Sequence, residues 1–113
     1  MPRNIIDSVQ GTLEFLILKT LSWGEMHGYA IARFIFDRSR EELQIDEGTL
    51  YPGLHRMEMK GLIKAEWGLS ENNRRAKYYA LTAAGRRELA QRVTAWDRFT
   101  KAVNRVVPAS AGS

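Results

Sequence analysis

The 113-residue sequence predicts a mainly α-helical fold with one small β-hairpin and a long C-terminal helix. Three segments within the first 60 residues carry apolar side chains at helical spacing. A short stretch after Gly61 alternates apolar and polar residues, as a half-buried strand does. The last third of the chain returns to helical spacing and continues to about Val107. A chain of this length predicts one domain with a modest core, which a partner subunit would help to complete.

The first helix is expected over Gln10–Ser22 and ends at Trp23 and Gly24. Its apolar residues lie nearly all round the helix: Leu13, Phe15, Leu16, Ile17, Leu18 and Leu21. A helix of this kind is covered on more than one side, so contacts from more than one direction are expected here.

The second helix is expected from Met26 or His27 to Ser39. Its buried face consists of Ile31, Phe34, Ile35 and Phe36. His27 opens this helix, and a capping or surface role suits it better than that of a ligand-binding residue. The segment Arg40–Ile45 is then a connector, with a short extended piece expected at Leu43–Ile45.

A third helix is predicted over Glu47–Lys60, with Asp46 as its N-cap and Gly61 as its C-terminal stop. Its core stripe is spaced by four and three residues: Leu50, Leu54 and Met57. Pro52 lies in the second turn and lacks the N–H that a helix interior uses. An irregular first turn is therefore expected.

A strand follows, because Ile63, Ala65 and Trp67 alternate with polar residues. The polar stretch 70–75 predicts a loop, and Ala76–Leu81 is the returning strand.

Thr82 is expected to cap the last helix, which reaches about Val107, although Gly85 occupies the place of a capping-box Glu. At 1.5 Å per residue that helix is roughly 40 Å long, too long to pack wholly on so small a body. The sequence thus divides into a body at 1–82, a long helix at 83–107 and a low-complexity tail at 108–113 that is expected to be disordered.

The charge is unevenly distributed. Residues 1–60 carry 7 Lys or Arg and 9 Asp or Glu, whereas residues 61–113 carry 10 and 4. A basic half favours a polyanion such as nucleic acid or an acidic membrane surface, and a solvated surface without a partner explains it equally well. No apolar run is long enough to span a bilayer, and the first ten residues lack the apolar core of a signal peptide, so a cytoplasmic protein without a membrane is expected.

Enzymatic chemistry is poorly supported. The sequence has no Cys, which excludes disulfides, thiolate zinc sites and Cys nucleophiles. His27 and His55 fall on different predicted helices, and no metal-ligand spacing or phosphate-binding Gly-rich loop is present. We therefore expect no enzyme, no metal and no cofactor.

The third helix offers a polar face beside its core stripe. Thr49, Gly53, Arg56 and Lys60 fall within about 40° of one line, roughly 100° from that stripe. A hydroxyl, a bare backbone and two cations on one face suit a helix lying in the major groove of DNA, with Gly53 permitting close approach. For this helix alone, solvated surface charges are the better supported reading.

The predicted hairpin shifts the interpretation from solvated surface charges towards DNA binding. Its tip and returning strand bring together two amides and three cations: Asn72, Asn73, Arg74, Arg75 and Lys77. Such a cluster suits phosphates or a minor groove, and an ordinary soluble turn is the alternative. Three helices followed by a basic hairpin predict the winged form of the helix-turn-helix.

Several stretches resemble one known family: 27–31 (His-Gly-Tyr-Ala-Ile), 47–58 with Gly-Thr-Leu-Tyr-Pro, 61–63, Trp67, and 74–86 with Lys-Tyr-Tyr-x-Leu-Thr. Their order and spacing are similar to those of the phenolic-acid-decarboxylase regulator (PadR) family of bacterial transcription factors. The resemblance runs from about Gln10 to Arg105. The single C-terminal helix looks like the smaller of the two architectures in that family.

The resemblance implies a homodimeric winged-helix repressor that binds a palindromic operator near its own operon. Thr49, Tyr51 and Arg56 match the DNA-facing motif of the family, although helical projection puts Tyr51 roughly 200° from Thr49 and favours packing at the flank. His27 and Tyr29 open a helix whose N–H groups favour a phosphate, while helix initiation and core packing are an equal alternative. A winged-helix module that binds a protein partner remains the competing function.

The last helix carries a seam spaced 4-3-4-3-4: Leu89, Val93, Trp96, Thr100, Val103 and Val107. The resemblance implies that this dimerisation helix exchanges contacts with the partner's first helix, which brings in Leu13 and Leu16. It also implies a small-molecule effector, since some relatives hold flat aromatic compounds near the dimer axis. Trp96 and Phe99 are the candidates for such a site, and simple filling of the interface by Trp96 is the favoured alternative.

Overall fold

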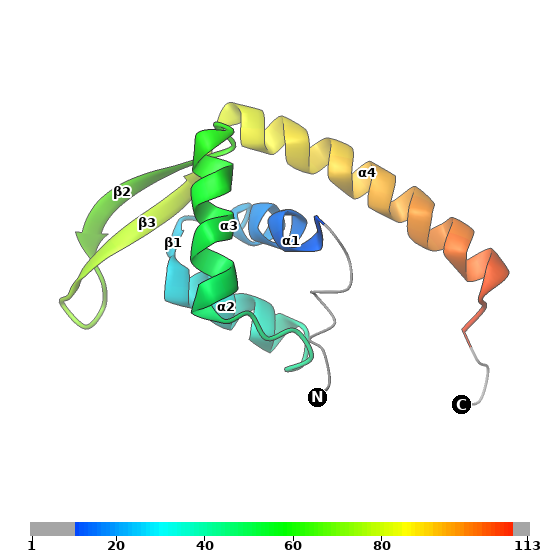
Figure 1. The fold of residues 1–113 in the computed structure, drawn as a ribbon, viewed down its shortest axis with the longest axis horizontal. Helices are drawn as coiled ribbons and strands as arrows, with labels where there is room; N and C mark the ends of the chain where they lie inside the picture. The colour runs from blue at the N-terminus through cyan, green and yellow to red at the C-terminus, as the bar shows by residue number, and fades with distance from the viewer. Residues whose placement is uncertain (1–10, 110–113) are drawn as a thin grey trace.

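The computed structural model describes residues 11–109, and it has the predicted order of helices and hairpin (Figure 1). The elements are α1 Thr12–Leu21, β1 Met26–His27, α2 Gly28–Arg38, α3 Glu47–Met59, β2 Ile63–Leu69, β3 Arg75–Leu81 and α4 Ala83–Val106. This is a mainly helical winged-helix fold with a three-stranded antiparallel sheet and a long C-terminal helix.

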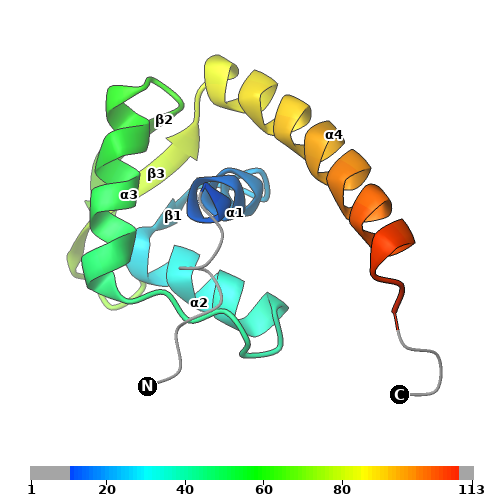
Figure 2. The same ribbon diagram turned by 45° about the vertical axis from the view of Figure 1, so that its right-hand side comes forward.

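The helix α1 is the centre of the body, as its all-round apolar pattern predicts. In both views it lies between α3 and α4, with α2 on its third side (Figures 1 and 2). Its Ile17 and Leu18 are fully buried. The fully buried side chains of the core come from three helices: Ile17, Leu18, Ile31, Leu50, Leu54 and Met57. Their burial supplies the main stabilising term of the fold.

Side-chain caps set the starts of α2, α3 and α4. Nδ1 of His27 accepts a hydrogen bond from the N–H of Ala30 at 3.2 Å, which confirms His27 as a capping residue. Oδ1 of Asp46 accepts from the N–H of Thr49 at 2.8 Å, as the sequence predicts. Each cap satisfies one of the N–H groups that the first turn of a helix leaves unpaired. α3 continues through Pro52 without a break, so the irregularity expected there is not observed.

The sheet contains one strand more than predicted. Met26 and His27 form a two-residue strand that pairs with Tyr79 and Tyr78, so the sheet order is β1-β3-β2 and α2 begins only at Gly28. The expected extended piece at 43–45 is not a strand. β2 and β3 pair from Ile63↔Leu81 to Leu69↔Arg75, which makes the hairpin slightly longer than predicted.

The start of α4 is fixed against the turn that follows α3. Oγ1 of Thr82 accepts from the N–H of Gly85 at 3.0 Å and donates to the carbonyl of Gly61 at 2.6 Å. Gly85 is buried, and a Cβ at this position would collide with the backbone carbonyl of Leu62. The missing capping-box Glu is thus explained, because no side chain fits at position 85.

The C-terminal part of α4 extends beyond the body in both views (Figures 1 and 2). The described residues span 49 × 32 × 23 Å, and every residue from 101 to 109 is exposed. Leu89 instead belongs to the core of its own chain and is only 9% exposed. Its assignment to the intersubunit seam is corrected accordingly, since it has little surface left for a partner. Over residues 11–109, no helix is long and apolar enough to cross a membrane.

Candidate nucleic-acid interface

The outward face of α3 is the face opposite its core stripe. Gly48, Tyr51, Pro52, His55 and Met59 are all exposed there, and Met59 is 76% exposed. Their spacing of three and four residues places them on one side of the helix. We call these five residues the outward face. Of them, the sequence reasoning identified only Tyr51, because it took the face beside the core stripe rather than the one opposite it.

Of the predicted line of Thr49, Gly53, Arg56 and Lys60, the last three lie against α1. Gly53 is buried, and a Cβ there would lie 3.1 Å from Cδ2 of Leu13. Gly53 thus permits close packing of α1 on α3, and the expectation that it opens a surface to DNA is corrected. Leu13 likewise packs within its own chain, against the core.

Arg56 and Lys60 keep about half of their side-chain surface exposed, 54% and 53%. Both are paired with the carboxylate of Glu14 on α1, at 3.8 Å from Nε of Arg56 and 3.1 Å from Nζ of Lys60. Their charges are therefore held at the edge of the outward face, and Glu14 is a partner that sequence periodicity could not reveal.

A groove of about 340 Å³ joins the start of α2 to the tip of the hairpin. The residues that line it come from three places in the sequence: His27, Gly28, Tyr29, Tyr51, Ser70, Glu71, Asn72, Arg75 and Ala76. The structure thus brings His27, Tyr29 and Tyr51 together with Asn72 and Arg75 of the wing. The ring of His27 stacks edge-on against Tyr78 at 5.4 Å, while Tyr29 is 69% exposed.

The tip of the wing is held by its own turn. The N–H of Asn73 donates to the carbonyl of Ser70 at 2.9 Å, and Asn73 adopts a positive φ of 58°, which Asn tolerates better than most residues. Asn72, Asn73 and Arg74 are exposed. Among residues 11–109, no ion pair involves Arg74.

The cations of the returning strand are partly engaged. The guanidinium of Arg75 lies over the exposed ring of Trp67 at 4.5 Å, and Nζ of Lys77 pairs with Glu58 of α3 at 3.3 Å. Burial, with a smaller contribution from the Glu58 carboxylate, raises the pKa of Tyr79, whose ring lies 5.8 Å from Nζ of Lys77. Arg75 is pre-positioned by its stacking on Trp67, a residue that the sequence reasoning did not assign to this surface.

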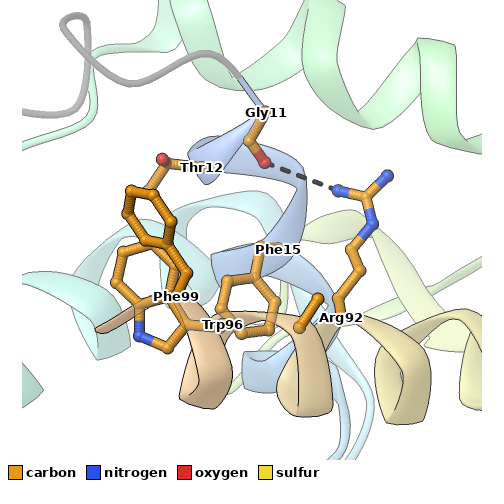
Figure 3. Close-up of a pocket in the computed structure, with 7 residues that line it drawn as sticks. Gly11, Thr12, Phe15, Arg92, Trp96 and Phe99 are labelled. Carbon is orange, nitrogen blue, oxygen red and sulfur yellow. Dashed lines mark hydrogen bonds between the residues drawn. The ribbon is translucent and has the colours of Figure 1, made fainter. Parts of the chain in front are cut away.

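A second hollow, of about 270 Å³, lies between α1 and α4 (Figure 3). Phe15 and Trp96 pack with ring centroids 5.8 Å apart, and Phe99 lies 6.0 Å from Trp96. Arg92 closes one end and donates to the carbonyl of Gly11 at 3.5 Å. Trp96 and Phe99 thus line a cavity together, with Phe15 as a third aromatic wall that had not been predicted. Trp96 remains 43% exposed.

The rest of the predicted seam is largely uncovered within one chain. Val93, Trp96, Val103 and Val107 are exposed by 42%, 43%, 38% and 65%. Oγ1 of Thr100 donates to the carbonyl of Trp96 at 3.0 Å, which satisfies this polar member of the stripe within its own helix. Leu16 of α1 lies at the edge of the core and remains partly accessible.

Over residues 11–109, no three His, Cys, Asp or Glu residues form a group that could hold a metal ion. His27 and His55 lie on different elements, as expected.

Comparison with known proteins points to a single family. A family model for the PadR-like family of transcriptional regulators matches residues 17–91. Over 87 residues the chain is 33% identical to the transcriptional regulator Rv3488 of Mycobacterium tuberculosis, covering 77% of this chain and 78% of that protein.

Solved structures of PadR-like regulators have a similar fold. A PadR family transcription regulator from Clostridium difficile has 35% identity and a TM-score of 0.75, covering 86% of this chain and 99% of that one. A PadR-like transcriptional regulator from Bacillus cereus has 27% identity and a TM-score of 0.79, covering 92% and 99%. The chain therefore belongs to the PadR-like family of transcriptional regulators, and it is a DNA-binding winged-helix protein rather than an enzyme.

Proposed function

We propose that this protein is a homodimeric repressor that reads a palindromic operator near its own operon. The observation that carries the proposal is the position of the outward face of α3, exposed and next to the basic wing. A helix with one exposed side, flanked by cations, suits the major groove, where base edges carry a distinct pattern of donors and acceptors.

The residues divide into two roles. The outward face reads bases, with His55 at its centre and Tyr51 on the side of the groove, while Thr49, Arg56 and Lys60 flank it. The wing binds phosphates or the minor groove through Asn72, Asn73, Arg74, Arg75 and Lys77. His27 and Tyr29 border the same groove at the N-terminus of α2, where N–H groups favour a phosphate. Contacts with phosphates give affinity without sequence preference.

The apolar stripe of α4 supports a dimer. Val103 and the exposed part of Trp96 lie on a helix that extends beyond its own body, where a second copy would cover them. Contacts of this kind with the partner's α1, near Leu16, would complete the small core. A two-fold axis then sets two half-sites about 10 base pairs apart, or a multiple of that spacing.

The proposal also includes a small aromatic effector that relieves repression. The three aromatic rings around the α1–α4 hollow support a flat ligand there that changes the angle between the two DNA-reading units (Figure 3). Gel shifts with a panel of planar aromatic compounds test it. A Trp96→Ala variant that stays dimeric but no longer responds to an active compound supports a ligand role, whereas loss of the dimer shows that Trp96 serves the interface.

Footprinting on the DNA next to the protein's own gene tests the function as a whole. Protection of two related half-sites on one face of the duplex, at nanomolar to micromolar protein, is the expected result. A random duplex of the same length is the control. Equal binding to both, together with capture of a protein partner by the wing, would instead favour a protein-interaction module.

A further inference from the structure

Glu14 of α1 is the one described carboxylate that ion pairs join to both α3 and α4. Its oxygens lie 3.1 Å from Nζ of Lys60, 3.8 Å from Nε of Arg56 and 3.6 Å from a terminal nitrogen of Arg92. The side chain of Glu14 is only 12% exposed, so these pairs are poorly screened by solvent. The first two cations flank the outward face, and the third belongs to α4.

Arg92 has other partners besides Glu14. It also binds Glu88 at 2.7 Å, donates to the carbonyl of Gly11, and lines the hollow between α1 and α4 (Figure 3). One carboxylate therefore connects the wall of that hollow to two cations beside the DNA-reading helix.

We propose that Glu14 is a positioning residue whose carboxylate pairs with Arg92 of α4 and with Arg56 and Lys60 of α3. The strength of the pairs with Arg56 and Lys60 sets how readily these two cations bind a DNA phosphate. A carboxylate has about four acceptor positions. Lys60 contacts both oxygens of Glu14, at 3.1 and 3.3 Å, and Arg56 and Arg92 each contact one, so the three cations together use these positions. A stronger ion pair between Glu14 and Arg92 weakens the ion pairs of Glu14 with Arg56 and Lys60, and the reverse is also true. This inference rests on the proposed DNA-reading role of α3.

A DNA phosphate competes with Glu14 for Arg56 and Lys60, because these two side chains are accessible to solvent. Arg56 and Lys60 are half exposed, so a DNA phosphate can reach them, whereas Glu14 is nearly buried. Every cation that leaves Glu14 for a phosphate adds close to one released counterion to DNA binding. Glu14 therefore suppresses the part of affinity that does not depend on sequence, and leaves discrimination to the outward face.

Two substitutions with opposite signs test the proposal. Glu14→Gln frees Arg56 and Lys60, so the slope of log K against log salt for a random duplex should steepen by about 1 to 2. Arg92→Gln leaves Glu14 to the α3 cations alone, so the slope should become shallower, by up to ~1. In the double variant the effect of Arg92→Gln should shrink to that of the same charge change elsewhere on α4, since its coupling to Arg56 and Lys60 runs through Glu14.

The matched controls are Asp97→Asn and Arg98→Gln, which make the same charge changes on exposed residues of α4. Asp97 pairs only with Lys101 among residues 11–109, at 2.9 Å. The controls should change the slope by less than half as much. Circular dichroism melts of all variants establish that the fold is kept.

Equal slope changes in each variant and its control would overturn the proposal, because they would show a general effect of net charge. An effect of Arg92→Gln that stays larger than that of Arg98→Gln in the absence of Glu14 would overturn it as well. Unchanged slopes with a lower melting temperature would make Glu14 a structural tie only. A wild-type protein that binds all duplexes equally would count against operator reading, while the comparison of variants would still decide the role of Glu14.

Discussion

The phenol ring of Tyr51 on α3 lies directly over the backbone of Gly28, the first residue of α2. A Cβ at position 28 would stand 2.7 Å from the Tyr51 hydroxyl oxygen and 2.8 Å from Cε1. The absence of a side chain at Gly28 thus lets α2 and α3 approach, and Tyr51 lies at the edge of the groove beside the wing.

Gly28→Ala should therefore weaken operator binding with little loss of stability. The clashing atoms are the far end of a 44% exposed side chain, which can swing away. We expect a several-fold loss of affinity and a melting temperature within a few degrees of wild type. In a Tyr51→Ala background the same substitution should have no further effect on binding. An undiminished effect in that background would show that Gly28 acts without Tyr51.

Gly85→Ala should be far more damaging to the fold, because its new methyl group meets the backbone carbonyl of Leu62 rather than a mobile side chain. Overpacking of this kind costs about 1–3 kcal/mol, or more where backbone must move. Gly48→Ala is the matched control: it lies in the exposed first turn of α3, where a Cβ would make an ordinary contact at 3.4 Å with Oδ1 of Asp46, and it should change the free energy of unfolding by less than about 0.5 kcal/mol. Thermal melts measure both, and equal shifts for the two variants would contradict the packing described for Gly85.

The wing cations should differ in their effect on salt dependence. Arg74→Ala should lower the salt slope by ~1, because the side chain is exposed and loses one phosphate contact. Lys77→Ala should lower it by less, since Lys77 is shared with Glu58 at 3.3 Å. Gel-shift titrations at several salt concentrations measure this. A larger effect at Lys77 than at Arg74 would mean that DNA displaces Glu58 completely or that the tip does not reach the backbone.

Val103→Asp should dissociate the proposed dimer, because it introduces a charge into the apolar stripe of α4. Thr94→Asp places the same charge about 180° away round the helix, and should leave the dimer intact. Light scattering at micromolar concentration gives the mass directly. A wild-type monomer under those conditions would refute the dimer, and dissociation by Thr94→Asp alone would move the interface to the other face of α4.

Local signals in the sequence were sufficient for most of the fold. The caps by Asp46 and Thr82 depend on residues three positions apart, and both are present in the structure. β1 was missed because a two-residue strand has no periodicity, and it exists only through its pairing with Tyr78 and Tyr79.

The site was only partly predictable for the same reason. The core stripe of α3 is confirmed. The sequence places the DNA-facing side next to that stripe, whereas the side that we propose, with His55 and Met59, lies opposite it. The sequence does not predict the burial of Gly53, because Leu13, which covers it, lies forty residues away in the chain. Glu14 could not be found from the sequence at all, since its partners lie on two other helices.

The ratio of operator affinity to random-duplex affinity tests most directly whether the outward face of α3 reads the operator. It should be measured by fluorescence anisotropy at one salt concentration for His55→Ala and Arg74→Ala. We expect His55→Ala to reduce the ratio by about five- to 100-fold, the loss typical of one base contact, and Arg74→Ala to weaken both duplexes while preserving the ratio. An unchanged ratio in His55→Ala, with the ratio lost in Arg74→Ala, would contradict this assignment of the two surfaces.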